Sequence, residues 1–247
     1  MMTKFAQKYN ISGRTNIILQ ALISVNKDWA DLIERVHLKS GQLIIHAGVR
    51  PSLIYFPVDG LVSILVSPVS DWKKQAIQSA MCGDEDIVGF PALLSEVPSN
   101  YQAVVELDAP AFQCSTQAAR RLLDECPKSR AIIGRYADLA LTEAWEVMGG
   151  SVALATEDRL ISFLTRAWYV SNEKTLPFSQ PFIAKRMGAR RPSITEMLAR
   201  LETRGLIRRD VARVDVINPE ALLEHLEHIW PAMLVRRKAF KSAMAEV

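Results

Sequence analysis

The order of apolar and polar residues divides the chain into three stretches. From Thr15 to about Val36, apolar residues recur at helical spacing, which predicts one or two short helices. From Lys39 to about Ser115, short apolar runs alternate with turn residues, a pattern typical of an antiparallel sandwich, jelly roll or barrel. After Pro127 the pattern is helical again. Together the three stretches predict an α+β protein.

The strands of the middle stretch can be assigned one by one. Five are clear and a sixth, Ala111–Cys114, is weaker; the five are Gln42–His46, Leu53–Phe56, Leu61–Val66, Gln75–Met81 and Tyr101–Leu107. Turn residues separate them, including Pro68. Within this region, Ile87–Leu94 predicts a short helical insertion.

A long helix is predicted from Pro127, because proline suits the first turn of a helix and none follows before Val147. The pair Gly149-Gly150 is expected to end it. Its apolar stripe is too long to be buried within one domain, which favours a dimer in which two such helices pack together. The residues assigned to this interface are Ile133, Tyr136, Ala140, Ala144 and Val147. The alternative is a helix packed only on its own β domain.

The strongest functional pattern lies in residues 179–203. Ser179 suits the N-cap of a short helix, and Gly188 can adopt the left-handed conformation of the sharp turn that ends it. Small Ala184 lets a second helix approach, and Ile194 supplies an apolar contact six residues after the glycine. This spacing predicts a helix-turn-helix motif.

The charge distribution indicates what kind of partner this motif would bind. The whole chain has 30 Lys and Arg residues against 27 Asp and Glu, a net charge of +3 that names no partner. Between Leu176 and Arg213, however, nine basic residues stand against three acidic ones, which favours a phosphate backbone as the partner. Gly205–Ile217 then predicts a small β-hairpin, as in a winged helix. The alternative is a solvated basic helical cluster that binds nothing.

Three segments carry a resemblance to a known family: Gly41–Val66, the long helix and the winged motif of residues 176–207. They resemble the Crp/Fnr family of bacterial transcription regulators, over most of the chain from about Asn16 to Asn218. The resemblance implies a β-roll of the cyclic-nucleotide-binding type in residues 1–126, a dimerisation helix in 127–152 and a winged helix-turn-helix DNA-binding domain in 153–247. It also implies a homodimer on double-stranded DNA with a palindromic operator, and contacts with RNA polymerase.

The resemblance assigns roles to individual residues of the winged motif. Arg191 matches the arginine that reads a guanine at the start of the family's recognition helix, a bidentate contact common in the major groove. Glu196 falls at another base-reading position, where it either accepts from a cytosine amino group or orients an arginine. The positions that match phosphate contacts are Ser179, Gln180, Arg190 and Ser193, with Arg200 as a weaker candidate.

The candidate ligand pocket departs from the family pattern. Members that bind cyclic nucleotides have Gly-Glu at the start of a short helix and Arg-Ser or Arg-Thr eleven residues after the glycine. Here the corresponding pairs are Gly89-Phe90 and Asn100-Tyr101, so the ribose-binding glutamate and the phosphate-binding arginine are both replaced. A buried phosphate without its countercharge is costly. We therefore expect no cyclic AMP, and a pocket that either suits a neutral, largely apolar ligand or has collapsed on its own side chains.

No other pattern predicts a cofactor, a metal or a catalytic residue. No cysteine precedes Cys82, which excludes an N-terminal iron–sulfur cluster, and the three widely spaced cysteines predict no disulfide framework and so favour a reducing cytoplasm. Asp84-Glu85-Asp86 is expected to cap a helix rather than bind a metal. The sequence has no run of 18 apolar residues, so no membrane span is predicted. The main alternative function is a small-molecule-binding module whose winged helix contacts protein instead of DNA, and an enzyme comes third.

Overall fold

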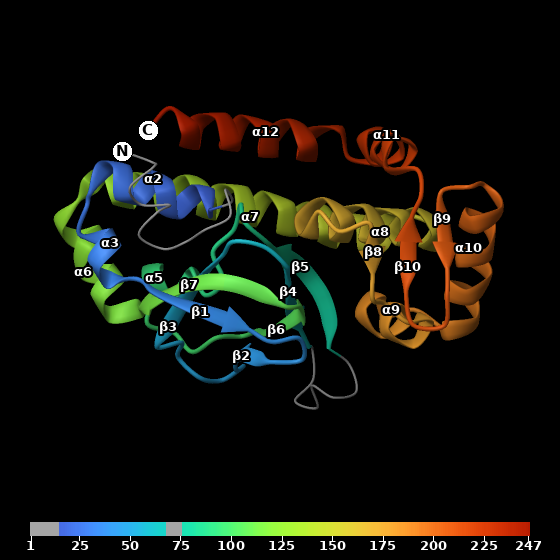
Figure 1. Ribbon diagram of the computed structural model, residues 1–247, viewed down its shortest axis with the longest axis horizontal. Helices are drawn as coiled ribbons and strands as arrows, with labels where there is room; N and C mark the ends of the chain where they lie inside the picture. Colours follow the sequence, from blue (N-terminus) through green and yellow to red (C-terminus); the bar gives the residue numbers. More distant parts are fainter. Residues whose placement is uncertain (1–14, 68–75) are drawn as a thin grey trace.

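The computed structural model describes residues 15–67 and 76–247. Its N-terminal half contains two antiparallel sheets (Figure 1). The first, in the order β1-β7-β3, consists of Glu34–Leu38, Ala109–Ser115 and Leu53–Pro57. The second, in the order β2-β6-β4-β5, consists of Leu43–Ile45, Gln102–Leu107, Leu61–Val66 and Ile77–Cys82. One buried cluster joins side chains of both sheets, so the predicted antiparallel β-roll is confirmed. The predicted turn at Pro68 and the strand residue Gln75 lie outside the described residues.

Four short helices flank the β-roll: α2 (Ile17–Val25), α3 (Trp29–Leu32), α5 (Pro91–Leu94) and α6 (Thr116–Glu125). Two predictions are corrected here. The helical region does not reach Val36, because Glu34–Leu38 pairs with β7 as a strand. Of the predicted insertion Ile87–Leu94 only the last four residues are helical, and Val88 forms an isolated bridge with Tyr55 instead.

The long helix α7 spans Pro127–Ala153 and does not end at Gly149-Gly150. The N–H group of Leu154 still donates to the carbonyl oxygen of Gly150, at 3.1 Å, so the helical hydrogen-bond pattern continues through the glycines. A Cβ atom at Gly150 would lie 2.5 Å from the ring of Trp230. This glycine therefore permits close packing of a later segment and does not break the helix.

The C-terminal half is a winged helix followed by two further helices. Its elements are α8 (Thr156–Ser171), β8 (Thr175–Leu176), α9 (Gln180–Met187), α10 (Arg191–Thr203), β9 (Ile207–Arg209), β10 (Val214–Val216), α11 (Pro219–Ile229) and α12 (Pro231–Ala245). The three strands pair in the order β8-β10-β9. The predicted helix-turn-helix and wing are therefore both present. No helix within residues 15–67 and 76–247 is long and apolar enough to cross a membrane.

The last helix, α12, leaves the winged motif and runs back along α7 to α2 (Figure 1). It packs on both of these helices, and Phe240 and Met244 join the apolar core of the N-terminal half. The assignment of all of residues 153–247 to the DNA-binding unit therefore needs correction at its C-terminal end.

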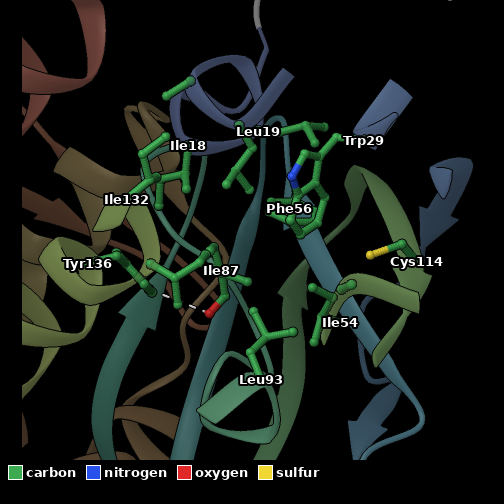
Figure 2. Packing of buried hydrophobic residues seen from close by; sticks show 14 of the residues in the cluster. Ile18, Leu19, Trp29, Ile54, Phe56, Ile87, Leu93, Cys114, Ile132 and Tyr136 are labelled. Atoms are coloured by element: carbon green, nitrogen blue, oxygen red, sulfur yellow. Dashed lines mark hydrogen bonds between the residues drawn. The ribbon is translucent and has the colours of Figure 1, made fainter. Parts of the chain in front are cut away.

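The core beneath α2, α7 and α12 also corrects the predicted dimer interface. Ile133 is fully buried and Tyr136 is 3% exposed, both within the same cluster as Trp29 and Phe56. Figure 2 shows Tyr136 directed toward Ile87, whose carbonyl oxygen accepts a hydrogen bond from the tyrosine hydroxyl. Ile133 and Tyr136 thus face the chain's own core and have no surface left for a second copy.

Asn16 connects α2 to the β-roll through four hydrogen bonds. Its side-chain oxygen accepts from the N–H groups of Ile18 and Leu19, which caps the helix. Its amide nitrogen donates to the carbonyl oxygens of Pro57 (3.0 Å) and Asp86 (2.7 Å). Asn16 is fully buried, so water cannot replace these partners.

We predict that Asn16→Ala lowers the free energy of unfolding by about 2–4 kcal/mol, since it removes a cap and leaves buried carbonyl oxygens unpaired. Asn26→Ala is the control, because Asn26 accepts one exposed hydrogen bond from Asp28 and should cost less than about 1 kcal/mol. Urea unfolding of both variants measures the difference. Equal losses would contradict the role given to Asn16.

Candidate nucleic-acid interface and sensor cavity

The helix-turn-helix motif is held by its own polar side chains. The Ser179 hydroxyl oxygen accepts from the N–H of Phe182, and α9 ends at Gly188 with a φ of +61°. The side-chain oxygen of Gln180 accepts a hydrogen bond of 2.7 Å from the hydroxyl of Thr195, which ties the start of α9 to α10. Ser179 and Gln180, both expected at the phosphate backbone, therefore also position the recognition helix. Ser193 lies half-buried in the first turn of α10.

Three cations remain free at the turn between α9 and α10. Arg190 and Arg191 are exposed at the start of α10, and Lys185 is exposed in the last turn of α9. Among the described residues, none of the three has a carboxylate within ion-pair distance. The free positive charge of the motif is therefore concentrated where a recognition helix would enter a groove.

The other six basic residues of residues 176–213 are paired with carboxylates. The pairs are Arg186–Glu106, Arg200–Glu196, Arg200–Glu157, Arg204–Glu157, Arg208–Asp215, Arg209–Glu202, Arg213–Asp210 and Arg213–Asp215. Three of the acids, Glu106, Glu157 and Asp215, lie outside the range in which the charge was counted. The local excess of positive charge is thus smaller than the sequence count suggests.

Two of these pairs change the view of individual residues. Glu196 contacts Arg200, so of its two expected roles the structure shows the orientation of an arginine. Arg200 is held by Glu196 and Glu157 together, which makes it less available to a phosphate than Arg190. Arg186 is half-buried, forms an ion pair of 2.6 Å with Glu106 of β6 and connects the motif to the β-roll.

A cavity of about 550 Å³ lies between the β-roll and α7. All four residues of the predicted pocket line it: Gly89, Phe90, Asn100 and Tyr101. The Phe90 ring meets Tyr136 of α7 edge to face, with ring centroids 5.0 Å apart. Most of the remaining lining is apolar, including Met81, Leu94 and Leu139. The cavity is open and has not collapsed on its own side chains.

One residue that lines this cavity was not predicted from the sequence. Arg237 of α12 is buried there, and its Nε and Nη2 atoms lie 2.6 and 2.8 Å from the two carboxylate oxygens of Glu143. Nη2 also donates to Asp86 Oδ1 at 3.1 Å, and the Tyr136 hydroxyl donates to the same oxygen at 3.3 Å. We call Asp86, Glu143 and Arg237 the buried ion cluster. It corrects the expected capping role of residues 84–86, because α5 begins only at Pro91 and the acids bind α12.

The electrostatics of the buried ion cluster are uneven. Burial raises the pKa of Glu143, but Arg237, together with Arg166 and Arg236, outweighs burial and holds this pKa below its usual value. Burial also raises the pKa of Asp86, and there Arg237 offsets only part of the increase, because the charge of Glu143 raises this pKa as well. For Arg237, the two carboxylates more than compensate burial and raise its pKa further.

The other candidate sensor groups lie away from solvent or away from the cavity. Cys82 and Cys114 are buried, and burial raises the pKa of Cys114 to about 12, so neither thiol ionises readily. Cys126 is half-buried just before α7. His46 is exposed, and His37 is half-exposed beside Asp108; neither lines the cavity.

Each half of the chain matches the model of a known domain family. A model of the cyclic nucleotide-binding domain matches residues 35–126, and a model of the Crp-like helix-turn-helix domain matches residues 158–225. The order of the two domains and the long helix between them are those of one group of regulators. The chain belongs to the Crp/Fnr family.

Solved Crp/Fnr structures share this fold. A CRP/FNR-family transcriptional regulator from Thermus thermophilus is 20% identical, with a TM-score of 0.61 over 78% of this chain and 98% of its own. FixK2 from Bradyrhizobium japonicum is 15% identical, with a TM-score of 0.65 over 78% and 96%. The c-di-GMP responsive regulator CLP of Xanthomonas campestris is 16% identical, with a TM-score of 0.62 over 81% and 97%. No curated protein matches the sequence.

For a Crp/Fnr protein, the charges of this cavity are unsuited to a cyclic phosphate. Phe90 and Asn100 offer no carboxylate for a ribose and no cation for a phosphate. Arg237 is cationic, but Asp86 and Glu143 already neutralise it. An anionic ligand would therefore meet two carboxylates against one guanidinium.

We predict that 1 mM cyclic AMP or cyclic GMP leaves the melting temperature unchanged, because a ligand without affinity for the native state cannot stabilise it. Calorimetric titration checks the same point independently. Saturable binding at micromolar concentration would show that the Arg237 guanidinium, or helix N–H groups, can serve the phosphate after all.

Proposed function

We propose that this chain is a homodimeric, sequence-specific DNA-binding transcription regulator whose cavity takes a neutral, largely apolar molecule. The observation that carries the proposal is the group of free cations Lys185, Arg190 and Arg191. Every other basic residue of the motif is paired, so the unpaired positive charge lies at the turn between α9 and α10. A winged helix that contacts protein has no need of such a localised charge.

Arg191 is assigned to a guanine and Arg190 to the phosphate backbone. Both are exposed at the first positions of α10, the end of a recognition helix that enters the major groove. Arg191 has a planar fork of donors that matches the two acceptors of a guanine edge. Ser193 and Glu196 follow on the same helix, and Glu196 keeps Arg200 away from the bases by holding it in an ion pair.

We expect Arg191→Ala to weaken binding to the selected DNA site by about 1–3 kcal/mol and to relax preference at one base pair. Arg190→Ala should weaken binding to all sequences alike, because a phosphate contact reads no base. Arg204→Ala is the matched control, since this arginine is exposed but already paired with Glu157 at 3.1 Å. Titrations at fixed salt separate the three; an Arg191 variant as tight as wild type would refute the assignment.

The dimer proposal now rests on a different face of α7. Four large apolar side chains are exposed along this helix at spacings of four, three and four residues: Leu141 (50% exposed), Trp145 (58%), Met148 (63%) and Val152 (86%). This is the spacing of a coiled-coil seam. Of the originally assigned residues, Ala144 is exposed beside this stripe, while Ala140 and Val147 are half-buried and line cavities.

A charge in the middle of the stripe should separate the two copies, because it would be buried without a partner. We predict that Trp145→Glu is a monomer in sedimentation and binds the operator at least tenfold more weakly. Arg135→Glu, exposed on α7 but off the stripe, should remain a dimer. A dimeric Trp145 variant would place the interface elsewhere.

Two-fold symmetry has a consequence for the DNA. A symmetric dimer presents two recognition helices, so the operator should be palindromic with half-sites about one helical turn apart. Contact with RNA polymerase is the remaining part of the proposal and is supported by family membership alone. The competing function, a small-molecule module with a protein-binding wing, predicts no steep salt dependence of DNA affinity.

A further inference from the structure

The C-terminal helix α12 lies outside both regions matched by the family models, which end at residues 126 and 225. It nevertheless completes the N-terminal half of the molecule. Phe240 and Met244 pack in the same apolar core as Ile133 and Tyr136, and Lys241 donates to Glu85 at 2.8 Å. A segment that continues the winged helix is therefore built into the domain that carries the cavity.

Arg237 is the point at which α12 reaches the cavity itself. Among the described residues that line the cavity, Arg237 alone comes from α12; the rest belong to the β-roll, the segment around α5, and α7. The partners of Arg237 also line it: Asp86 from the β-roll side and Glu143 from α7. The lining of the cavity is therefore complete only while α12 is docked.

Docking of α12 and formation of the buried ion cluster are one event. If α12 left its place, Asp86 and Glu143 would lose the guanidinium that compensates them, at positions 3% and 6% exposed. Water would then enter the cavity beside Asp86 and Glu143, because uncompensated carboxylates must be solvated. An apolar molecule binds a dry cavity better than a wet one, so it binds the docked state preferentially.

The docked helix also restrains the DNA-binding unit. The winged motif is joined to α7 through residues 154 and 155, and α11 leads from the wing directly into α12 through Trp230. Trp230 packs against Gly150 of α7, and α11 packs on α8. The unit is therefore held by the chain connection, by α12 and by its own packing on β4 and β5, where Arg186 pairs with Glu106 of β6.

We propose that α12 is a latch on the sensor cavity, so that a molecule bound in the cavity and the docking of this helix stabilise each other. The proposal rests on the cavity's sensor role in the proposed function. A ligand shifts such an equilibrium only through unequal affinity for its two states, and the coupling is reciprocal. Occupancy of the cavity thereby strengthens the attachment of the winged-helix unit through α12.

The first test compares two charge-removing substitutions on α12 by amide hydrogen exchange. Arg237→Met removes the ion pair from the two buried carboxylates Asp86 and Glu143 and should speed exchange of the amides of residues 238–245 at least tenfold. Lys238→Met removes the same charge from an exposed neighbour with no partner among the described residues and should change nothing. Unchanged exchange of α12 in the Arg237 variant would overturn the latch.

The second test uses wild-type protein and a neutral apolar dye, N-phenyl-1-naphthylamine. At tenfold its dissociation constant, the dye should slow exchange of residues 238–245 about tenfold. Amides of the wing strand β9 should not respond. The Arg237 variant should bind the dye at least tenfold more weakly than the Lys238 variant, an effect that a purely structural arginine far from the ligand would not produce.

The outcomes separate this proposal from the proposed function. Dye binding that leaves α12 exchange unchanged would overturn the latch, and so would the absence of saturable dye binding. Neither result bears on DNA binding, which is measured without the dye. Conversely, loss of DNA specificity in the Arg191 variant supports the proposed function alone, and the exchange measurements decide the latch.

Discussion

The ion cluster of Asp86, Glu143 and Arg237 is the interaction on which the arrangement of this molecule depends. It brings together three segments that are far apart in sequence: the segment after β5, the middle of α7 and the C-terminal helix α12. A buried carboxylate is tolerated only with a compensating charge and hydrogen bonds, and here one guanidinium serves two carboxylates. Removing Arg237 would leave both carboxylates without this ion pair. The cluster thus fixes where α12 lies and how the cavity ends.

Ion pairing also divides the basic residues of the winged-helix half into two groups. Six of them pair with carboxylates of α8, α10, the wing and the β-roll. Exposed pairs of this kind contribute little free energy each, but they fix the orientation of long side chains. Lys185, Arg190 and Arg191 are left unpaired at the turn between α9 and α10. Under the proposed function, specificity for DNA depends on this separation between arginines that build the motif and arginines that are free to contact bases.

The sequence was sufficient for the parts of the fold that follow local rules. Alternation and turn residues located the strands from Leu43 onward in the β-roll but not β1, and the spacing of Ala184, Gly188 and Ile194 located the helix-turn-helix, because each of these patterns depends on neighbours along the chain. The sequence was not sufficient where residues far apart along the chain determine which face of a helix is buried. Ile133 and Tyr136 lie on an apolar stripe of α7, and so do Leu141 and Trp145 on another face. Hydrophobic periodicity alone cannot tell which of the two stripes is buried. In the structure, α2 and α12 cover the stripe that contains Ile133 and Tyr136.

The same limit applies to the site residues. All four predicted pocket residues line one cavity, because they follow a family pattern at fixed spacing. Arg237 belongs to no such pattern, and its role becomes visible only when α12 returns to the β-roll. Likewise, Glu106, Glu157 and Asp215 neutralise arginines from outside the counted segment. A local charge count cannot include partners that only the fold brings near.

Selection and sequencing of random DNA fragments bound by the purified full-length protein test the central claim most directly. The account predicts enrichment of one palindromic motif, with half-sites about one helical turn apart and a guanine at the position that Arg191 contacts. It also predicts that the enrichment weakens steeply as salt rises, since phosphate contacts contribute to the affinity. Recovery of fragments with no motif beyond that of the input library would contradict the claim that this protein is a sequence-specific regulator.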